Sequence, residues 1–571
     1  MQEILHYFKN RNLTLFEEFE NSALKIYDVQ NYIPIYNRFF NLEDNNNNLL
    51  NLNNKYRIQS IGKENKFRVH DCEIYDNNNN KYTKSVFFKC SPLIDPVKYM
   101  VGKYDHIDNV LKLPTFNIVD CHKKVKDYNN SAYIDGFFSF LSSKLLNNYN
   151  MFNCIDFYGG FLGYQSEFHY DIYDDVEYLL ESDFFNQNKD QLFTVDEDVL
   201  NKLLNTEYGF SLHETRDKRK RLKISSNKCK IEINDLDDEQ FEDIFVSTSD
   251  SSDNEITDKN IVSNNNKKST NTKTSSSSFS SRYSDTNSDD SMSESDSDED
   301  EDEDDSDMDS QSGSISTTSS DEEIYAKIFN FPIELICLEK CENTLDNLMK
   351  YGNLDIPEWR SILMQVIMNL LMFQKSFNFT HNDLHTNNIM YIETQREFLY
   401  YKVDNTYYKV PTFGKLFKII DFGRAIYKFN GNTFCSDSYH KHGDAATQYN
   451  IEPYFNDKKP RLEPHFGFDL CRLGCALYDD LVEEDDDITN PLSDVIKDWC
   501  TDDKGKNILY KTNGKERYPD FKLYIMIARC VHNPTPKNQL SKDFFAIYET
   551  TRKKINKKTK IMDIDALPSF V

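Results

Sequence analysis

The stretch Thr380–Tyr391 reads THNDLHTNNIMY, and the stretch Lys418–Ala425 reads KIIDFGRA. The first contains the spacing H-x-D-x-x-x-x-N, in which Asp383 precedes Asn388 by five residues and an apolar run follows at once. The second is an apolar run that ends at Asp421 in the triplet D-F-G. Each apolar run predicts a short buried strand, so the polar side chains are expected at the ends of strands.

These oxygen-bearing side chains match the needs of phosphoryl transfer, which requires a carboxylate beside the acceptor hydroxyl and oxygen ligands for Mg²⁺. Their order resembles the catalytic and metal-binding loops of the protein kinase superfamily. The resemblance implies that Asp383 is the catalytic base and that Asn388 and Asp421 bind Mg²⁺. It makes His381 a structural residue beneath the loop. The alternative is that the first stretch is a solvated turn and that D-F-G is an unrelated turn. This alternative does not explain the strands that are predicted beside both motifs.

The resemblance extends to the residues that would hold the phosphates of ATP. Lys89 ends the run V-F-F-K and resembles the V-A-I-K lysine that grips the α- and β-phosphates. The stretch S-I-G-K-E-N around Gly62 resembles the phosphate-covering loop, with one glycine where the family has three. No glutamate occurs between residues 73 and 167, so Asp135 is the expected substitute for the helix glutamate that pairs with the lysine.

The adenine side of the site is expected around L-E-K-C. The resemblance makes Leu338 the gatekeeper, and it assigns Glu339 and Cys341 to the hinge, whose backbone would hydrogen-bond adenine. Met390 would form the apolar floor beneath the base. Phe87 stands where the family usually has alanine, which predicts a narrower pocket.

Two substitutions bear on mechanism. Asn382 replaces the arginine that receives an activation-loop phosphate in many kinases, so activity is expected without phosphorylation of the activation segment, Gly431–Asn450. His385 replaces the lysine two residues after the catalytic aspartate, as in haspin-like and other divergent kinases. Its imidazole would contact the γ-phosphate as a second catalytic group and confer pH sensitivity near its pKa. Asp469, in FDLCRLG, resembles the aspartate that anchors the catalytic loop.

Hydrophobic periodicity predicts mainly strands before the acidic stretch and mainly helices after it. Strands are expected at 56–58, 67–69, 85–89, 155–162 and 332–338, and helices at 132–149 and 357–379, with the rest, to about residue 550, helical and partly irregular. The resemblance implies an α+β, two-lobed protein-kinase-like fold with a small β-rich lobe and a large mainly helical lobe. Its expected segments are an N-terminal extension (1–54), the first part of the small lobe (55–184), a disordered Ser/Asp/Glu-rich insertion (185–323), the end of the small lobe and hinge (324–340), the large lobe (341–550) and a C-terminal tail (551–571).

The formal charge of −28 is concentrated in one segment. From Tyr283 to Ala326 there are 18 acidic residues and no lysine or arginine, with an unbroken acidic run over Asp298–Asp305. Such a segment cannot bury enough apolar surface to offset its ordering entropy, so disorder is predicted. Its charge argues against direct binding of nucleic acid. It is either an insertion between two strands, which the motifs on both sides favour, or a linker between two domains.

Other features exclude several classes of protein. The 12 cysteines form no C-x-x-C pair, which argues against a zinc ribbon and favours a reducing, intracellular compartment. The N-terminus lacks a secretory signal, and the longest apolar run is too short to span a bilayer. Asparagine and tyrosine richness with long insertions is similar to predicted serine/threonine kinases of giant DNA viruses such as the mimivirus group. That resemblance implies the host cytoplasm or the virion.

The leading hypothesis is an ATP- and Mg²⁺-dependent serine/threonine-protein kinase acting on a protein substrate. One alternative is a small-molecule kinase of the choline or aminoglycoside type, and another is a pseudokinase scaffold whose acidic tract is the working part. The tract itself is either a solvated tether or a substrate for an acid-directed kinase of the casein-kinase-2 type. Candidate serines with acidic residues shortly after them include Ser288, Ser291, Ser293, Ser295 and Ser297.

Overall fold

The computed structural model describes residues 5–43, 45–104, 107–116, 121–196, 324–482 and 490–571. These residues form a mixed α+β fold with several sheets, in agreement with the fold class predicted from the sequence. Within these ranges no helix combines the length and the apolar character needed to cross a membrane. The predicted disorder of the acidic tract concerns residues outside the described ranges.

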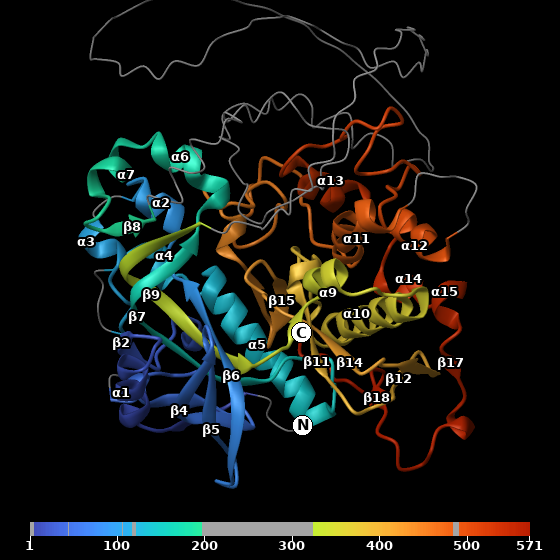
Figure 1. Cartoon of the computed structure of the whole chain (residues 1–571), viewed down its shortest axis with the longest axis horizontal. Coiled ribbons are helices and arrows are strands. Elements are labelled where there is room, and N and C mark those ends of the chain that lie inside the picture. The colour runs from blue at the N-terminus through green and yellow to red at the C-terminus, as the bar shows by residue number, and fades with distance from the viewer. Residues whose placement is uncertain (1–4, 44, 105–106, 117–120, 197–323, 483–489) are drawn as a thin grey trace, which may run out of the picture. The chain divides into compact units, whose positions relative to one another are not determined.

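A seven-stranded sheet holds most of the strands before the helical part, in the order β2-β7-β9-β6-β5-β4, with β8 paired to β9 (Figure 1). Alternate residues of β5 and β6 are buried, as expected for strands with one face on a core. The strands are β2 (Ile26–Gln30), β4 (Tyr56–Lys66), β5 (Val69–Asp76), β6 (Lys81–Pro92), β7 (Phe157–Asp171), β8 (Phe193–Val195) and β9 (Tyr325–Glu339).

The acidic stretch departs from and returns to adjacent strands. β7 and β9 pair antiparallel as far as Asp171 opposite Tyr325, and Val195 on β8 lies opposite Ala326 on β9. The residues between Val195 and Ala326 therefore connect cross-strand partners, which favours an insertion over a linker between domains. The predicted insertion begins too early, because residues 185–196 still contribute part of α7 (Asp183–Asn188) and all of β8.

The described residues before β4 pack against this sheet and contribute one strand to it. β2 extends it beyond β7, and α1 (Leu13–Asn21) places Phe19 against Phe88 at 6.1 Å between ring centroids. Phe39 stacks on Phe137 with centroids 4.9 Å apart. The other elements here are β1 (Tyr7–Lys9), η1 (Pro34–Arg38), η2 (Asn47–Leu49) and β3 (Leu50–Leu52), with β1 and β3 forming a two-stranded sheet.

Helix α5 (Ser131–Tyr149) follows the strands and is buried on all sides from Ala132 to Leu145. A helix without a polar face must be enclosed, and α5 contacts both β7 and β9. Asn130 caps its start by accepting a hydrogen bond from the Ala132 N–H, and Asn150 ends it in the left-handed conformation. The shorter helical elements around it are α2 (Pro96–Met100), α3 (Ile107–Val110), α4 (Lys123–Lys126), η3 (Tyr173–Asp175) and α6 (Val176–Leu180).

The second half of the chain is arranged around α10 (Ile356–Phe377), a nearly fully buried helix. Asp355 and Glu358 form a reciprocal capping box at its start, and Asn378 in the left-handed conformation ends it. The remaining helical elements are α9 (Leu345–Tyr351), η5 (Thr386–Asn388), η6 (Asp437–Tyr439), α11 (Phe468–Leu481), α12 (Pro491–Trp499), α13 (Lys522–Cys530), α14 (Pro536–Gln539), α15 (Asp543–Ala546) and η7 (Arg552–Lys554).

Three small sheets accompany these helices, in the orders β10-β11-β14, β17-β13-β12-β18 and β15-β16. The second was not predicted from the sequence, although Asp404-Asn405, both with positive φ, is a hairpin-turn signal between two aromatic runs. The strands are β10 (Asn343–Thr344), β11 (Ile389–Glu393), β12 (Phe398–Val403), β13 (Thr406–Pro411), β14 (Lys415–Ile419), β15 (Ile426–Phe429), β16 (Asn432–Cys435), β17 (Glu549–Thr550) and β18 (Met562–Asp563).

Replacing residues 198–322 with a Gly/Ser linker of about ten residues should leave the fold intact, because loop-closure cost grows only logarithmically with length. The melting temperature should stay the same or rise by a few degrees, measured by circular dichroism. A matched deletion of residues 186–322 also removes β8 and should lower the melting temperature. Equal melting temperatures for the two deletions, or loss of folding in the first, would contradict the insertion geometry.

Candidate functional site

The two sequence motifs meet because β11 and β14 are antiparallel neighbours. Ile389 lies opposite Ile419, and the N–H of Ile420 donates to the carbonyl of Asn388 at 3.0 Å. Asn388 precedes one strand and Asp421 follows the other, so both lie at the same end of the ladder. The pairing thus brings together the two residues predicted to bind a metal.

Asp469 on α11 anchors the loop that precedes β11. Its carboxylate accepts hydrogen bonds from the N–H groups of His381 at 2.9 Å and Asn382 at 2.8 Å. Asn382 adopts a φ of +65°, a conformation that asparagine tolerates better than most residues. The His381 ring, fully buried, contacts the carbonyl of Ile420 at 2.9 Å. His381 and Asp469 therefore have the structural roles expected of them.

Asp383 is surrounded by groups that stabilise its charge. Tyr524 on α13 donates to its Oδ1 at 3.0 Å, and Tyr524 in turn accepts from Arg472 Nε at 2.9 Å. A guanidinium nitrogen of Arg424 lies 4.0 Å from the same oxygen. Burial would raise the pKa of Asp383, but Arg424 first, and then His385 and Arg472, outweigh burial and lower it to about 2. Asp383 is therefore ionised and a weak base.

Lys89 links the sheet to both halves of the site. Its Nζ lies 2.6 Å from Asp135 Oδ2 on α5 and 2.8 Å from Asp421 Oδ1. Burial opposes the charge of Lys89, but the two carboxylates outweigh it and raise the lysine's pKa. The partner predicted for Lys89 in place of a glutamate is thus in contact with it.

Helix α5 also contacts Phe422, which follows Asp421 in the sequence. Asp135 Oδ1 accepts a hydrogen bond from the Phe422 N–H at 2.9 Å. The Phe422 ring is buried against Phe138 of α5, with centroids 4.7 Å apart. Burial raises the pKa of Asp135 even though Lys89 opposes the rise, whereas the charge of Lys89 lowers the pKa of Asp421. A displacement of α5 would therefore disturb Lys89 and Asp421 together.

A further carboxyl group, which was not predicted from the sequence, lies near this ion pair. Glu334 on β9 is 1% exposed, and its Oε2 has no hydrogen-bond partner among the described residues. Its side chain lies against Gly136, where any Cβ would collide with Oε1. Burial first, and then the charge of Asp135, raise its pKa well above the ordinary value. These surroundings favour the protonated, neutral form of Glu334.

The donor set at the strand ends fits Mg²⁺. Asn388 Nδ2 donates to the carbonyl of Asp383 at 2.9 Å, and its Oδ1 accepts no hydrogen bond from the described residues. The side chain of Asp421 is 47% exposed. Mg²⁺ typically takes one or two protein oxygens and completes its shell with phosphate and water. No group of three or more His, Cys, Asp or Glu side chains in the described ranges could hold a metal by itself.

The predicted phosphate-covering loop is wrong in position. Gly62 and its neighbours belong to strand β4, at a point where the pairing with β5 shifts register. A Cβ at Gly62 would collide with the carbonyl oxygen of Asp71, so the glycine permits close approach of two strands. The turn lies instead at Phe67-Arg68, where a strand was expected and where Arg68 has a φ of +59°.

The residues predicted to form the hinge lead into β10, which pairs with β11. Leu338 lies opposite Phe87, and Met390 lies opposite Thr344 just after the hinge. The N–H of Glu339 is already bonded to the carbonyl of Asp156 at 3.0 Å, whereas the N–H of Cys341 donates to no described residue. Of the two predicted hinge contacts, Cys341 is the one with a free donor.

The Glu339 side chain has a structural role that the sequence reasoning missed. It accepts from the Asp156 N–H at 2.7 Å and forms an ion pair with Lys418 of β14. Lys418 also donates to the carbonyl of Cys154 at 2.8 Å. The pair joins the end of β9 to the strand that leads to Asp421.

His385 lies beside Asn388, with its Nε2 3.1 Å from the Asn388 amide nitrogen. Burial lowers its pKa to about 4, although the charge of Asp383 opposes the shift. The imidazole is therefore neutral at pH 7, and the pH sensitivity expected near its ordinary pKa is displaced to more acidic values.

Arg472, Tyr524, Arg424 and Glu334 are the residues near the site that sequence reasoning missed. The sequence contained a signal for Arg472, because this residue follows Asp469 by three positions and therefore lies on the same face of α11. Tyr524 had none, since 141 positions separate it from Asp383.

No family model matches the chain. The uncharacterised protein ZK177.2 of Caenorhabditis elegans is 24% identical over 106 residues, which make up 17% of this chain and 36% of that protein. The chain thus matches about a third of the length of this curated relative. The name of that protein assigns no activity to it.

Lowering the pH from 7 to 5 should destabilise the wild type more than His385→Gln, by about 2 kcal/mol in the free energy of unfolding. The unfolded chain binds a proton at the ordinary pKa of histidine, whereas the folded protein resists protonation down to about pH 4. Protonation therefore favours unfolding as the pH falls. Urea unfolding at both pH values measures the difference, and parallel losses in the two proteins would refute the neutral, buried imidazole.

Raising the pH from 5 to 8 should destabilise the wild type relative to Glu334→Gln. The unfolded glutamate ionises near its ordinary pKa, while burial keeps the folded carboxyl protonated, so stability declines as the pH rises toward the folded pKa. The glutamine variant cannot ionise at this position. Urea unfolding across this range is the measurement, and pH dependences that coincide for the two proteins would contradict a protonated Glu334.

Proposed function

We propose that the chain is a Mg²⁺- and ATP-dependent serine/threonine-protein kinase with a two-lobed kinase-like fold. The observation that carries the proposal is the contact of Lys89 with Asp135 on one side and Asp421 on the other. It joins a sheet lysine, a helix carboxylate and the D-F-G aspartate beside Asn388. A protein kinase needs these groups in place together.

The arrangement of strands supports the same proposal. The order β4-β5-β6-β9-β7 is that of the five strands of a kinase small lobe, in which the lysine strand is central. The hinge then leads into α9 and α10, and the catalytic loop follows α10 directly. The extra strands β2 and β8 lie outside this pattern, with β2 in the N-terminal extension and β8 just before the insertion.

Each residue would have a role in phosphoryl transfer that suits its environment. Bound Mg·ATP would supply the phosphoryl group and the cation that neutralises its charge. Lys89 would hold phosphate oxygens, and Asn388 and Asp421 would hold the metal. Asp383, with a pKa of about 2, would orient the acceptor hydroxyl rather than remove its proton early. The free N–H of Cys341 would bond adenine.

A transfer assay with labelled ATP and Mg²⁺ tests the proposal, with casein and basic proteins offered beside choline and aminoglycosides. Wild type should label protein, and Asp383→Asn and Asp421→Ala should each lose about 10²-fold or more, because they remove the orienting and metal-binding carboxylates. Asp404→Asn is the matched control, since Asp404 pairs with Lys537 on the surface, away from the catalytic groups.

Label on a small molecule instead of protein would replace the proposal with the choline or aminoglycoside alternative. Failure of the wild type to transfer label to any acceptor, together with no Mg·ATP-dependent rise in melting temperature, would leave a pseudokinase scaffold. Equal activity of wild type and Asp421→Ala would exclude the assignment of this site.

A further inference from the structure

The position of α5 is decisive for the candidate site. Asp135 on α5 bonds both Lys89 and the Phe422 N–H, so both contacts depend on where the helix lies. Many kinases hold this helix through a phosphate on the activation segment, which a basic residue of the catalytic loop receives. Here the residue at that loop position is Asn382, so another contact must hold the helix.

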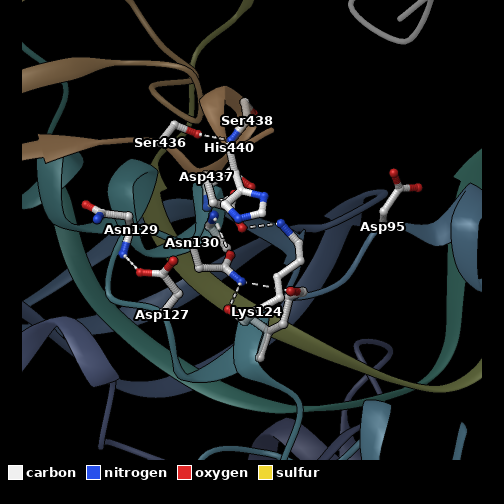
Figure 2. A network of polar contacts seen from close by, with 12 residues as sticks. Asp95, Lys124, Asp127, Asn129, Asn130, Ser436, Asp437, Ser438 and His440 are labelled. Carbon is white, nitrogen blue, oxygen red and sulfur yellow. Dashed lines mark hydrogen bonds and ion pairs between the residues drawn. The ribbon is translucent and has the colours of Figure 1, made fainter. Parts of the chain in front are cut away.

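Asp437 of the activation segment contacts the first residue of α5, and Figure 2 shows Asp437 beside Lys124 and the Asn129-Asn130 pair that precedes this helix. Asp437 Oδ1 accepts a hydrogen bond from the Ser131 N–H at 3.1 Å, and Oδ2 pairs with Lys124 of α4. The N–H of Asp437 donates to the carbonyl of Asn129 at 2.7 Å. A carboxylate at this end of a helix is stabilised by the helix dipole as well as by the hydrogen bond.

The residues just before α5 complete the connection. The Asn129 side chain accepts from the N–H of Cys435 at 3.3 Å. The Asn130 side chain donates to the carbonyl of Leu93 at 2.8 Å and to that of Lys124 at 3.0 Å. The start of α5 is therefore tied to the end of β6 on one side and to the activation segment on the other.

The side chains that could bind a phosphate on the activation segment already have other partners. Asn382 is buried, and its side chain donates to the carbonyl of Arg424 at 3.1 Å and accepts from Tyr449 at 2.7 Å. Lys124 is paired with Asp437, and this carboxylate raises the pKa of the lysine despite its burial. The segment is therefore held by an acidic side chain that is part of the sequence.

We propose that Asp437 is a positioning residue that substitutes for an activation-segment phosphate, fixing α5 so that Asp135 holds Lys89 and the Phe422 amide without any modification. The proposal rests on the kinase function proposed above. Asp437 acts through Asp135 and does not itself touch the substrates.

The experiment compares wild type, Asp437→Asn, Asp437→Glu and Asp404→Asn in the labelled-ATP assay, each after phosphatase treatment. Asp437→Asn should lower kcat at least tenfold with little change in KM for the protein acceptor, because the helix loses its charged anchor. Asp437→Glu should recover part of the loss, and Asp404→Asn should match wild type. In an Asp135→Asn background, Asp437→Asn should cause no further loss of kcat, since both residues act through the contact between Asp135 and Lys89.

Hydrogen exchange at Ser131–Ile134 provides a readout independent of transfer, and it should be faster in Asp437→Asn than in wild type. Unchanged kcat in Asp437→Asn, loss of wild-type activity after phosphatase treatment, or additive losses with Asp135→Asn would each overturn the proposal. If the wild type transfers no phosphate, the proposed function fails. Exchange then still decides whether Asp437 fixes α5, and unchanged exchange overturns that claim.

Discussion

The whole site depends on one ammonium group held between two carboxylates. Lys89 comes from the sheet, Asp135 from α5 and Asp421 from the end of β14, so three separately folded elements meet at a single charge. The Asp135 side chain is buried, so removing Lys89 would leave a buried carboxylate without its compensating charge. The sheet, the helix and the metal-site loop are therefore constrained to one relative arrangement by electrostatics as well as by packing.

Around this centre, buried carboxylates take different charge states according to their neighbours. Asp383 is surrounded by guanidinium groups and stays ionised, whereas Glu334 faces Asp135 in an apolar setting and is expected to keep its proton. The same physical rule separates the two: burial penalises charge unless a nearby opposite charge outweighs it. The surroundings of Asp383 thus favour its charged form, and those of Glu334 favour its neutral form.

The sequence was most informative where local patterns determine the structure. The H-x-D-x-x-x-x-N and D-F-G motifs, the buried helix carrying Asp135 and the lysine strand could all be predicted, because each depends on a short period or spacing. The loop around Gly62 was misplaced because its single glycine serves close strand approach rather than a turn. Tyr524 and Asp437 could not be found, since their contacts with Asp383 and Ser131 span 141 and 306 positions.

The terminal segments packed around the site have a consequence for how the protein folds. The Phe570 N–H donates to the carbonyl of Ser376 at the end of α10, and the Asn430 N–H donates to the carbonyl of Phe570. At the other end, Arg38 bonds Asn432, 394 positions away. Contacts of such sequence separation give a high contact order, which slows folding and leaves apolar surface exposed during synthesis. The contacts that join the two terminal segments to the rest of the fold are therefore expected to form late in folding.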